Sequence, residues 1–481
     1  MNLSKKVVSS SFWSMFDSIA DKISILIIYA ILARLVGVEE LGYVAFSLII
    51  IELITLIIGM GIKESLIKSE EWNLKKVNTA FWLLITFGAI FSLLIYFVFA
   101  DLVSRFHSSE VANILTAFCL YPVMNSINIF QISYLQREFK YKILAFRSII
   151  TTTVSGVVGI YFAFDDSGAM ALVYSKYTQI LLSTVILWNA TRYFPKIEFS
   201  YKLASELCSF GFPLVISQVV KFSHQRMVDV LVGIYFGTYY FAILDVGRKG
   251  VQTVFQMTLT PLNSVSLSYF SRTSDKHEAF SSFVSIVSCF VYPLVLSIGY
   301  FSTEIIYIAF GEKWSESAYI LQTLSFGVFH ATIGWYLPNY LVAMSQPKLV
   351  LYFTLLDLFL VITGCVIASS LDFNAFVIVS VFSMSISVSI KLIVLRIYSD
   401  FSLRRFLKAM LGPITGSTIL LLSNYSLEFS PLVKLVSSDS LIFEYSLKII
   451  IFGGLGLVVY AVVICLFFKE LFFNLKKLVN K

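Results

Sequence analysis

Long apolar stretches separated by short polar loops run through almost the whole chain. A helix needs about 20 apolar residues to cross a hydrocarbon layer of ~30 Å, and we count fourteen stretches of that kind. Their apolar runs are continuous and do not alternate with period two, which argues against the strands of a β-barrel. The predicted spans are 12–35, 40–62, 78–100, 111–134, 143–163, 169–190, 208–234, 238–263, 280–301, 317–342, 349–370, 373–396, 407–427 and 445–468. The pattern therefore predicts an all-α polytopic membrane protein.

The composition agrees with a chain that is surrounded by lipid. Of its 481 residues, 58% are hydrophobic and only 14% are charged, whereas soluble domains carry about 25% charged residues. The mean hydropathy is +0.84. A soluble, a disordered or a nucleic-acid-binding protein is excluded on this ground, despite the net charge of +7.

Basic residues are distributed unevenly between the loops. With the N-terminus placed in the cytoplasm, about 23 Lys and Arg residues fall in cytoplasmic loops, and about four fall outside, namely Arg34, Arg105, Lys313 and Lys434. An excess of positive charge on the cytoplasmic side is the usual orientation signal of membrane proteins. Because one missed span would invert every later loop, this bias predicts an even number of spans and two cytoplasmic termini.

Motifs for covalent chemistry are missing from the sequence. No Gly-x-x-x-x-Gly-Lys phosphate loop occurs, and the five cysteines stand singly within apolar spans, without the spacing of metal ligands. The longest outer loop, roughly residues 428–444, is far shorter than the ~50 residues of a small soluble domain. We therefore expect no enzyme activity, no catalytic residue, no metal and no cofactor. Transport through the helix bundle is the economical interpretation.

Two segments about 200 residues apart resemble each other. Residues 35–46 (LVGVEELGYVAF) and 235–244 (YFGTYYFAIL) each place a glycine turn between two long spans, with a small residue five positions further on. This offset pairs the first span with the seventh and the second with the eighth, as in transporters built from two similar halves. A tight apolar hairpin is the alternative. The repeat predicts an N-terminal lobe at 1–190, a C-terminal lobe at 207–396, and two further helices with a cytoplasmic tail at 404–481.

Polar and charged side chains concentrate on a few of the predicted spans, and ionisable groups at bilayer depth usually face a polar cavity. They are Asp17, Asp21 and Lys22 on the first span, Lys221, His224, Arg226 and Asp229 on the seventh, Asp245, Arg248, Lys249 and Gln252 on the eighth, and Glu52 alone on the second. We expect the basic residues among them, with His224 and Gln252, to line a hydrated cavity that holds an anionic substrate. The five acids would pair with these cations in the empty state, or carry a coupling proton or sodium ion. Ion pairs that only fix helix packing are the alternative.

Five other groups inside the spans receive different interpretations. His330, in a Gly-Phe-His-Ala context, is interpreted as a hydrogen-bonded core histidine. Arg147, Lys176 and Lys391 could extend to a membrane interface. Asp357, nearer the middle of its span, could equally be a minor cavity residue.

Four short motifs occur in order across most of residues 1–400. They are 31–43 (ILARLVGVEELGY), 135–142 (LQREFKYK), the segment from 210–214 (FGFPL) through 229–233 (DVLVG) to Gly237, and 310–314 (FGEKW). With these motifs in a chain of fourteen spans, the sequence resembles bacterial polysaccharide flippases of the O-antigen and exopolysaccharide type. Their superfamily also holds multidrug exporters and the lipid II flippase.

The resemblance implies a V-shaped bundle that opens inward or outward. It implies that the protein moves an undecaprenyl-diphosphate-linked oligosaccharide repeat unit from the inner to the outer leaflet of the bacterial inner membrane, by alternating access, for lipopolysaccharide O-antigen, capsule or exopolysaccharide biosynthesis. A polysaccharide polymerase and a chain-length regulator are the protein partners that it suggests. Asp245-x-x-Arg248-Lys249 departs from the Leu/Tyr-rich run that often follows Gly237 in the family. The driving force stays open between an ion gradient and removal of the product.

Two other functions compete with this interpretation. A cation-coupled multidrug exporter of the same fold would hold acids and aromatics for cationic drugs. Here the predicted cavity has at least as many bases as acids, which favours an anionic substrate. A membrane glycosyltransferase or polymerase is a third hypothesis, and it predicts a catalytic outer loop, which the sequence lacks.

Overall fold

The computed structural model describes residues 21–59, 61–68, 73–432, 436, 438 and 440–467. Every regular element among these residues is a helix, and no strand occurs in this part of the chain. The prediction of an all-α polytopic membrane protein is therefore confirmed. By their internal contacts the residues form two units, Met1–Ala242 and Ile243–Lys481. The predicted lobes at 1–190, 207–396 and 404–481 stay predictions.

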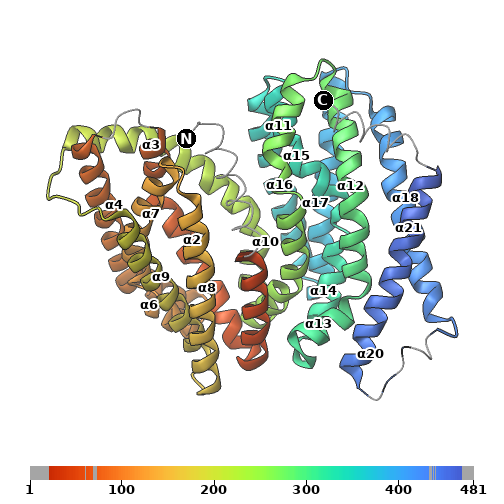
Figure 1. Ribbon diagram of the computed structural model, residues 1–481, viewed down its shortest axis with the longest axis horizontal. Helices are drawn as coiled ribbons and strands as arrows, with labels where there is room; N and C mark the ends of the chain where they lie inside the picture. Colours follow the sequence, from red (N-terminus) through yellow and green to blue (C-terminus); the bar gives the residue numbers. More distant parts are fainter. Residues whose placement is uncertain are drawn as a thin grey trace. The chain divides into compact units, whose positions relative to one another are not determined.

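The first unit begins, within the described residues, with a helix over 21–35. The elements that follow are α2 (Val38–Gly59), α3 (Ile62–Lys68), α4 (Leu74–Leu94), the π-helical turn η1 (Ile95–Phe99), α5 (Ala100–Phe106), α6 (Ser109–Ala117), α7 (Tyr121–Arg137), α8 (Tyr141–Phe164), α9 (Ala169–Thr191) and most of α10 (Tyr201–Thr258) (Figure 1). The division between the units falls inside α10.

The second unit holds the end of α10 and the helices after it. They are α11 (Leu262–Arg272), α12 (Lys276–Tyr300), α13 (Ser302–Phe310), the 3-10 turn η2 (Glu312–Trp314), α14 (Glu316–Ser325), α15 (Val328–Ala343), α16 (Pro347–Ala368), α17 (Phe373–Tyr398), α18 (Leu403–Glu428), α20 (Leu441–Lys448), the π-helical turn η3 (Ile449–Gly453) and α21 (Gly454–Phe467). The labels in Figure 1 follow this order.

Ten helices of the described residues are long and apolar enough to cross a membrane, or eleven when the bent pair α6 and α7 counts as one span. The predicted number of fourteen is thus not confirmed. The difference between fourteen and eleven spans arises at three places. The first predicted span begins before the described residues, α10 counts once although it covers most of two predicted spans, and one predicted span is divided between α14 and α15, of 10 and 16 residues.

The helix α10 is broken at Gly237, where the backbone has φ 84° and ψ 179°. Residues with a Cβ rarely adopt a positive φ, so glycine is the residue that permits this break. The break lies between the predicted spans 208–234 and 238–263. The second of these also ends earlier than predicted, because α10 stops at Thr258 and Pro261 precedes α11.

Short polar side chains start several of the helices. The side chain of Asn73 accepts hydrogen bonds from the backbone N–H groups of Lys75 and Lys76 at the start of α4. Asp275 accepts from two backbone N–H groups at the start of α12, and Asp372 accepts from that of Ala375 at the start of α17. These caps satisfy N–H groups that have no partner inside the helix. Such loop residues determine where the apolar helices begin.

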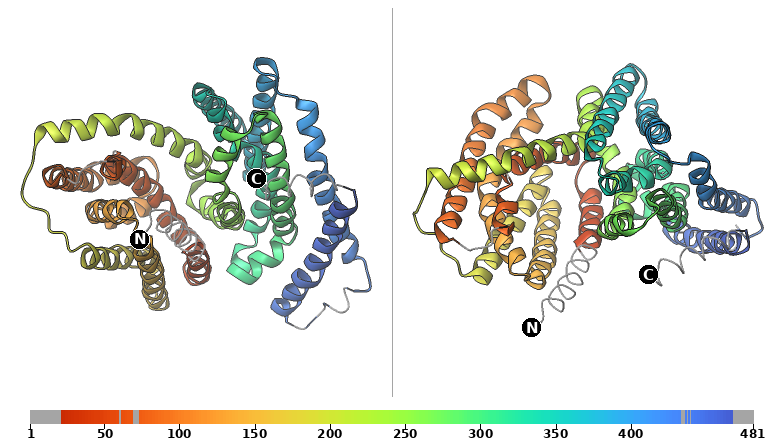
Figure 2. Two further views of the ribbon diagram at one scale, coloured as in Figure 1. Left: turned by 45° about the horizontal axis from the view of Figure 1, so that its top comes forward. Right: turned by 90° about the horizontal axis from the view of Figure 1, so that it is seen from above.

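The core of the first unit forms between α2, α4, α6, α7 and α9. Its buried side chains include Ile54, Leu84, Leu115 and Phe130. The helices α8 and α9 lie side by side (orange to yellow ribbons in Figures 1 and 2). At Gly42 the helix α2 approaches α10 so closely that an added Cβ would lie 2.2 Å from the carbonyl oxygen of Thr238. Small residues allow this kind of close packing in membranes, where lipid competes equally for apolar side chains.

The core of the second unit is aromatic. Helix α12 packs against α15 and α18. Phe280 of α12 stacks on Phe406 of α18, with ring centroids 6.0 Å apart and an interplanar angle of 11°, and it also contacts Tyr340 of α15. The hydroxyl of Tyr336 donates a hydrogen bond of 2.9 Å to the carbonyl oxygen of Leu259. Buried tyrosines thus contribute packing area and satisfy backbone groups near the helix ends.

Candidate functional site

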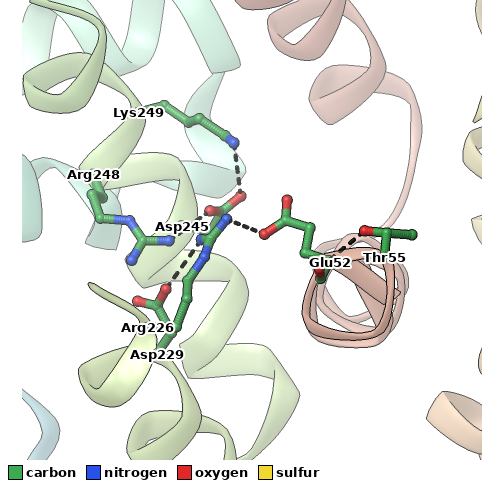
Figure 3. A network of polar contacts seen from close by, with 7 residues as sticks. All are labelled: Glu52, Thr55, Arg226, Asp229, Asp245, Arg248 and Lys249. Carbon is green, nitrogen blue, oxygen red and sulfur yellow. Dashed lines mark hydrogen bonds and ion pairs between the residues drawn. The ribbon is translucent and has the colours of Figure 1, made fainter. Parts of the chain in front are cut away.

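Arg226 contacts carboxylates from two helices of the first unit (Figure 3). Its Nη2 lies 2.6 Å from Oε2 of Glu52 on α2, and its Nη1 lies 3.2 Å from Oδ2 of Asp229. The i,i+3 spacing places Arg226 and Asp229 on one face of α10. Packing of α2 brings Glu52 to them across 174 positions of sequence. We call Glu52, Arg226 and Asp229 the first charged trio.

Because the first charged trio is partly buried, separating its ion pairs would cost free energy. The side chain of Asp229 has 0% exposure, that of Arg226 has 24% and that of Glu52 has 48%. A carboxylate without solvent needs a cation or hydrogen-bond donors nearby. Two carboxylates face one guanidinium, so the ionised trio has a net charge of −1. Arg226 is thus paired with two acids. This agrees with both interpretations of the sequence, acids that pair with the cations of a binding site and ion pairs that only fix helix packing, so the role of the trio stays a prediction.

A cavity of about 470 Å³ lies beside Glu52 in the first unit. It is lined by Glu52, Thr55, Leu56, Gly59, Gly61, Lys63, Glu64, Asn125, Ile129, Leu214, Val215, Gln218 and Phe222. These residues come from α2, the start of α3, α7 and the first segment of α10. Of the predicted site residues, Glu52 lines this cavity, and most of the lining was not predicted. A polar residue in an apolar span, such as Asn125, was the sequence signal that could have indicated it.

Asp245, Arg248 and Lys249 form the second charged trio, in the second unit (Figure 3). Nη2 of Arg248 is 3.1 Å from one oxygen of Asp245, and Nζ of Lys249 is 3.7 Å from the other. The side chain of Asp245 is 7% exposed, that of Arg248 19% and that of Lys249 30%. Here two cations face one carboxylate, so the ionised trio has a net charge of +1. The structure brings together the three residues that the sequence grouped.

The first predicted span is described only from residue 21, so Asp17 lies outside the described residues. Oδ1 of Asp21 accepts hydrogen bonds from Ser148 at 2.9 Å and from Thr152 at 3.0 Å, both on α8. Asp21 therefore ties its helix to α8. The side chain of Lys22 is half-buried next to it.

Three further predicted residues, Lys221, His224 and Gln252, also lie on α10 and are not members of the two charged trios as defined above. Lys221 is exposed, whereas His224 and Gln252 are half-buried. Their helix and register agree with the sequence analysis. A role in binding stays a prediction for all three.

The structure reveals a buried pair in the second unit that the sequence analysis misjudged. Nζ of Lys391 on α17 lies 2.5 Å from Oδ1 of Asp357 on α16, and the hydroxyl of Ser387 donates to the same oxygen at 2.5 Å. Lys391 is 5% exposed and Asp357 8%. The expectation that Lys391 extends to an interface is therefore wrong, because a buried carboxylate in the adjacent helix binds its ammonium. Opposite charges in two consecutive apolar spans were the available signal.

His330 matches its interpretation as a hydrogen-bonded core residue. Its Nδ1 lies 2.9 Å from the hydroxyl of Ser385 on α17. A further network that the sequence did not predict joins Lys448 to Glu304 at 2.5 Å and to Glu428 at 2.8 Å. It connects α20 to the start of α13 and to the end of α18. Within the described residues, no group of three or more His, Cys, Asp or Glu is arranged to hold a metal ion.

Comparison with known proteins places this arrangement in a family. The family model described as "Polysaccharide biosynthesis protein" matches residues 31–319, which is more than half of the chain and includes both charged trios. The chain belongs to this family. The resemblance that the four motifs indicated is thereby confirmed.

Two curated relatives are similar over much of their length. The "Succinoglycan biosynthesis transport protein ExoT" of Rhizobium meliloti is 21% identical over 300 residues, which cover 61% of this chain and 60% of that protein. The "Lipopolysaccharide biosynthesis protein WzxC" of Escherichia coli is 22% identical over 390 residues, which cover 77% of each chain. The chain thus spans less than two thirds of the first relative and about three quarters of the second.

The fold resembles that of the lipid II flippase MurJ in its inward closed conformation. The TM-score is 0.73 at 16% sequence identity, and the match covers 97% of this chain and 100% of that one. At this identity the likeness establishes the fold. The family model and the fold together identify a multi-pass membrane protein of polysaccharide biosynthesis.

Proposed function

We propose that this protein is a flippase that carries a lipid-linked oligosaccharide across the membrane for the biosynthesis of a surface polysaccharide. The cargo that we propose is an undecaprenyl-diphosphate-linked repeat unit. Relatives named for succinoglycan transport and lipopolysaccharide biosynthesis support the choice of pathway. The fold of a lipid II flippase supports the choice of mechanism.

One observation carries the anionic character of the proposed cargo. In the second charged trio, two basic side chains, Arg248 and Lys249, lie 3.1 Å and 3.7 Å from the carboxylate of Asp245 on the same helix. Basic side chains within an apolar span usually face a polar cavity or a ligand. A diphosphate would supply acceptor oxygens for the Arg guanidinium and negative charge for the Lys ammonium.

The proposal includes location and orientation. We place the protein in the bacterial inner membrane with both termini in the cytoplasm, because the basic residues gather in alternate loops. A lipid-linked unit is assembled at the cytoplasmic face in this scheme. A polysaccharide polymerase and a chain-length regulator would act on it after translocation.

A coupling proton or sodium ion is part of the same proposal. The carboxylates of Asp21, Glu52, Asp229 and Asp245 are its candidate carriers, with Asp17 from the sequence. Asp229 is the best placed of them, because it is fully buried and its carboxylate contacts Arg226.

A cation-coupled multidrug exporter of the same fold is the second candidate. It is supported by the first charged trio, whose net charge of −1 would attract an organic cation. The two candidates make opposite predictions for the second charged trio, since removal of its cations should impair transport of an anion and favour transport of a cation.

Complementation tests the proposed function. The gene would be expressed in a strain that lacks its own flippase for the same polymer, and surface polysaccharide would be measured. We expect the Arg248→Ala/Lys249→Ala variant to lower polymer output about tenfold or more, because charge-assisted contacts to phosphate of about 1.5–3 kcal/mol each are removed. Lys348→Ala, at an exposed position, is the matched control and should keep full output. Full polymer production by the double variant, at normal membrane levels, would overturn the proposal.

A further inference from the structure

The cavity beside Glu52 is large enough to be a ligand site. Its volume of about 470 Å³ falls within the range of about 300–1,000 Å³ that is typical of small-molecule pockets. All of its lining residues belong to the first unit. It therefore exists independently of the second charged trio, where we propose that the diphosphate binds.

The lining offers donors and acceptors suited to hydroxyl groups. Asn125 of α7 and Gln218 of α10 each present an amide, which donates and accepts at once, and Thr55 adds a hydroxyl. Leu56 and Gly59, in the last turn of α2, also line the cavity. Paired donors and acceptors from several elements can hold the adjacent hydroxyls of a sugar ring.

The charge of the lining argues against a phosphate as its occupant. Two carboxylates, Glu52 and Glu64, face one ammonium, Lys63, so the ionised lining has a net charge of −1. Arg226 lies next to Glu52 and is already paired with it and with Asp229. A diphosphate would be repelled here, whereas an uncharged hydroxyl-rich group would keep all of its hydrogen bonds.

Apolar side chains complete the cavity wall. Phe222, Ile129 and Leu214 lie among the polar groups. A sugar ring has polar edges and apolar faces, so a mixed wall of this kind suits it better than a uniformly polar or uniformly apolar one. Gly59 borders open space in the cavity, since a Cβ added there would meet no atom within 4 Å.

We propose that this cavity binds uncharged sugar residues of the lipid-linked oligosaccharide and selects the glycan, separately from the diphosphate. The inference rests on the proposed function and adds a subsite to it. Asn125 and Gln218 are its specificity-determining residues, through hydrogen bonds to sugar hydroxyls. An organic cation attracted by Glu52 and Glu64 is the competing occupant.

The experiment uses the full-length protein reconstituted in lipid vesicles and two probes. One probe is the lipid-linked oligosaccharide extracted from a flippase-deficient strain. The other is the same material trimmed by exoglycosidases to its first sugar. Translocation is measured as loss of accessibility to an impermeant periodate reagent, as a function of probe concentration. We expect the wild type to have a lower half-saturating concentration for the untrimmed probe.

The Asn125→Leu/Gln218→Leu variant should raise the half-saturating concentration for the untrimmed probe about tenfold, the equivalent of one or two lost neutral hydrogen bonds. Its value for the trimmed probe should not change, and this also serves as the test of correct folding. Gly59→Leu, which fills open space, should have the same selective effect. Asn189→Leu, the same chemical change at an exposed position of α9, is the control and should alter neither value.

The outcomes separate the two proposals. If the wild type translocates neither probe, the proposed function fails. If it translocates both with equal half-saturation, or if the double variant affects both probes equally, the glycan subsite is wrong and the function stands. If ethidium binds the wild type and binding is lost in Glu52→Gln/Glu64→Gln while the sugar probes are unaffected by Asn125→Leu/Gln218→Leu, the cavity holds a cation and the proposal is overturned.

Discussion

At the scale of single residues, buried charges in this protein occur with close partners of opposite sign. Arg226 has carboxylates at 2.6 Å and 3.2 Å, and Asp245 has cations at 3.1 Å and 3.7 Å. The two trios differ in composition, since the first has two acids and one base and the second has one acid and two bases.

His107 gives a pH-dependent prediction at the residue scale. It lies between α5 and α6, outside the membrane-spanning helices, and its ring is 4.6 Å from that of Phe46. Burial lowers the pKa of His107 below its ordinary value of 6.5. The folded state therefore binds fewer protons than the unfolded state. The contribution of His107 to the stability of the folded state is full above pH 6.5. It is lost as the pH falls through 6.5 towards the lower pKa that His107 has in the folded state.

We expect the melting temperature of the detergent-solubilised protein to fall between pH 7.5 and pH 5, with part of the fall due to His107. The His107→Gln variant should have a shallower dependence, because glutamine does not titrate. Differential scanning fluorimetry across this range measures both proteins. Identical pH profiles for the two would contradict a buried, neutral His107.

At the scale of elements, ion pairs join particular helices. The apolar pattern of the sequence does not determine which helix packs against which. Lys391 and Ser387 of α17 both bind Oδ1 of Asp357 on α16. Lys448 connects α20 to the residues Glu304 and Glu428. Apolar side chains select no particular neighbour inside lipid, whereas a buried charge is satisfied only by a partner at the right depth and rotation. These pairs therefore specify which helices pack together.

The Asp357 and Lys391 pair gives a prediction at this scale. Asp357→Ala removes the carboxylate and leaves a buried ammonium, so we expect a loss of about 3–5 kcal/mol in the free energy of unfolding. The Asp357→Leu/Lys391→Met variant removes both charges and should recover most of this loss. Unfolding by denaturant in detergent provides the measurement. A double variant that is as unstable as Asp357→Ala would indicate that the pair does not act as a unit.

At the scale of the whole molecule, the chain presents many apolar helices and alternate loops that differ in charge. The loop between α7 and α8 contains Arg137, Lys140 and Lys142 on or beside its ends, whereas the loop between α8 and α9 contains Asp165 and Asp166. Between them, α8 has 24 residues, which at 1.5 Å per residue is enough to cross the membrane. The predicted topology places these two loops on opposite sides.

Cysteine labelling tests this topology. In a variant whose five native cysteines are replaced, Asp166→Cys should react with an impermeant maleimide from outside intact cells. Glu138→Cys should react only after the membrane is permeabilised. Both positions are exposed, so both can react. Labelling of Glu138→Cys in intact cells, with none at Asp166→Cys, would mean that the predicted orientation is inverted.

Much of the fold could be predicted from the order of apolar and polar residues. Each predicted span corresponds to helical residues in the described part of the chain, because a lipid-spanning segment must satisfy its own backbone hydrogen bonds. The number of spans could not be predicted as reliably, since Gly237 joins two spans in α10 and the break between α14 and α15 divides another. Such breaks depend on the backbone dihedral angles of a few residues, and the hydrophobicity pattern of the sequence does not show these angles.

The candidate site was partly predictable for the same reason. A charge in an apolar span is conspicuous in a sequence, and an i,i+3 or i,i+4 partner on the same helix, such as Asp245 beside Arg248 and Lys249, can be read directly. The sequence by itself thus determined the helical class, the family and the residues of the two charged trios, since these follow from local hydrophobicity and motif order. Only the tertiary structure decided that Glu52 meets Arg226, that Lys391 meets Asp357, and that a cavity lies beside Glu52. These contacts join side chains from different helices, and packing geometry alone brings them within a few ångströms.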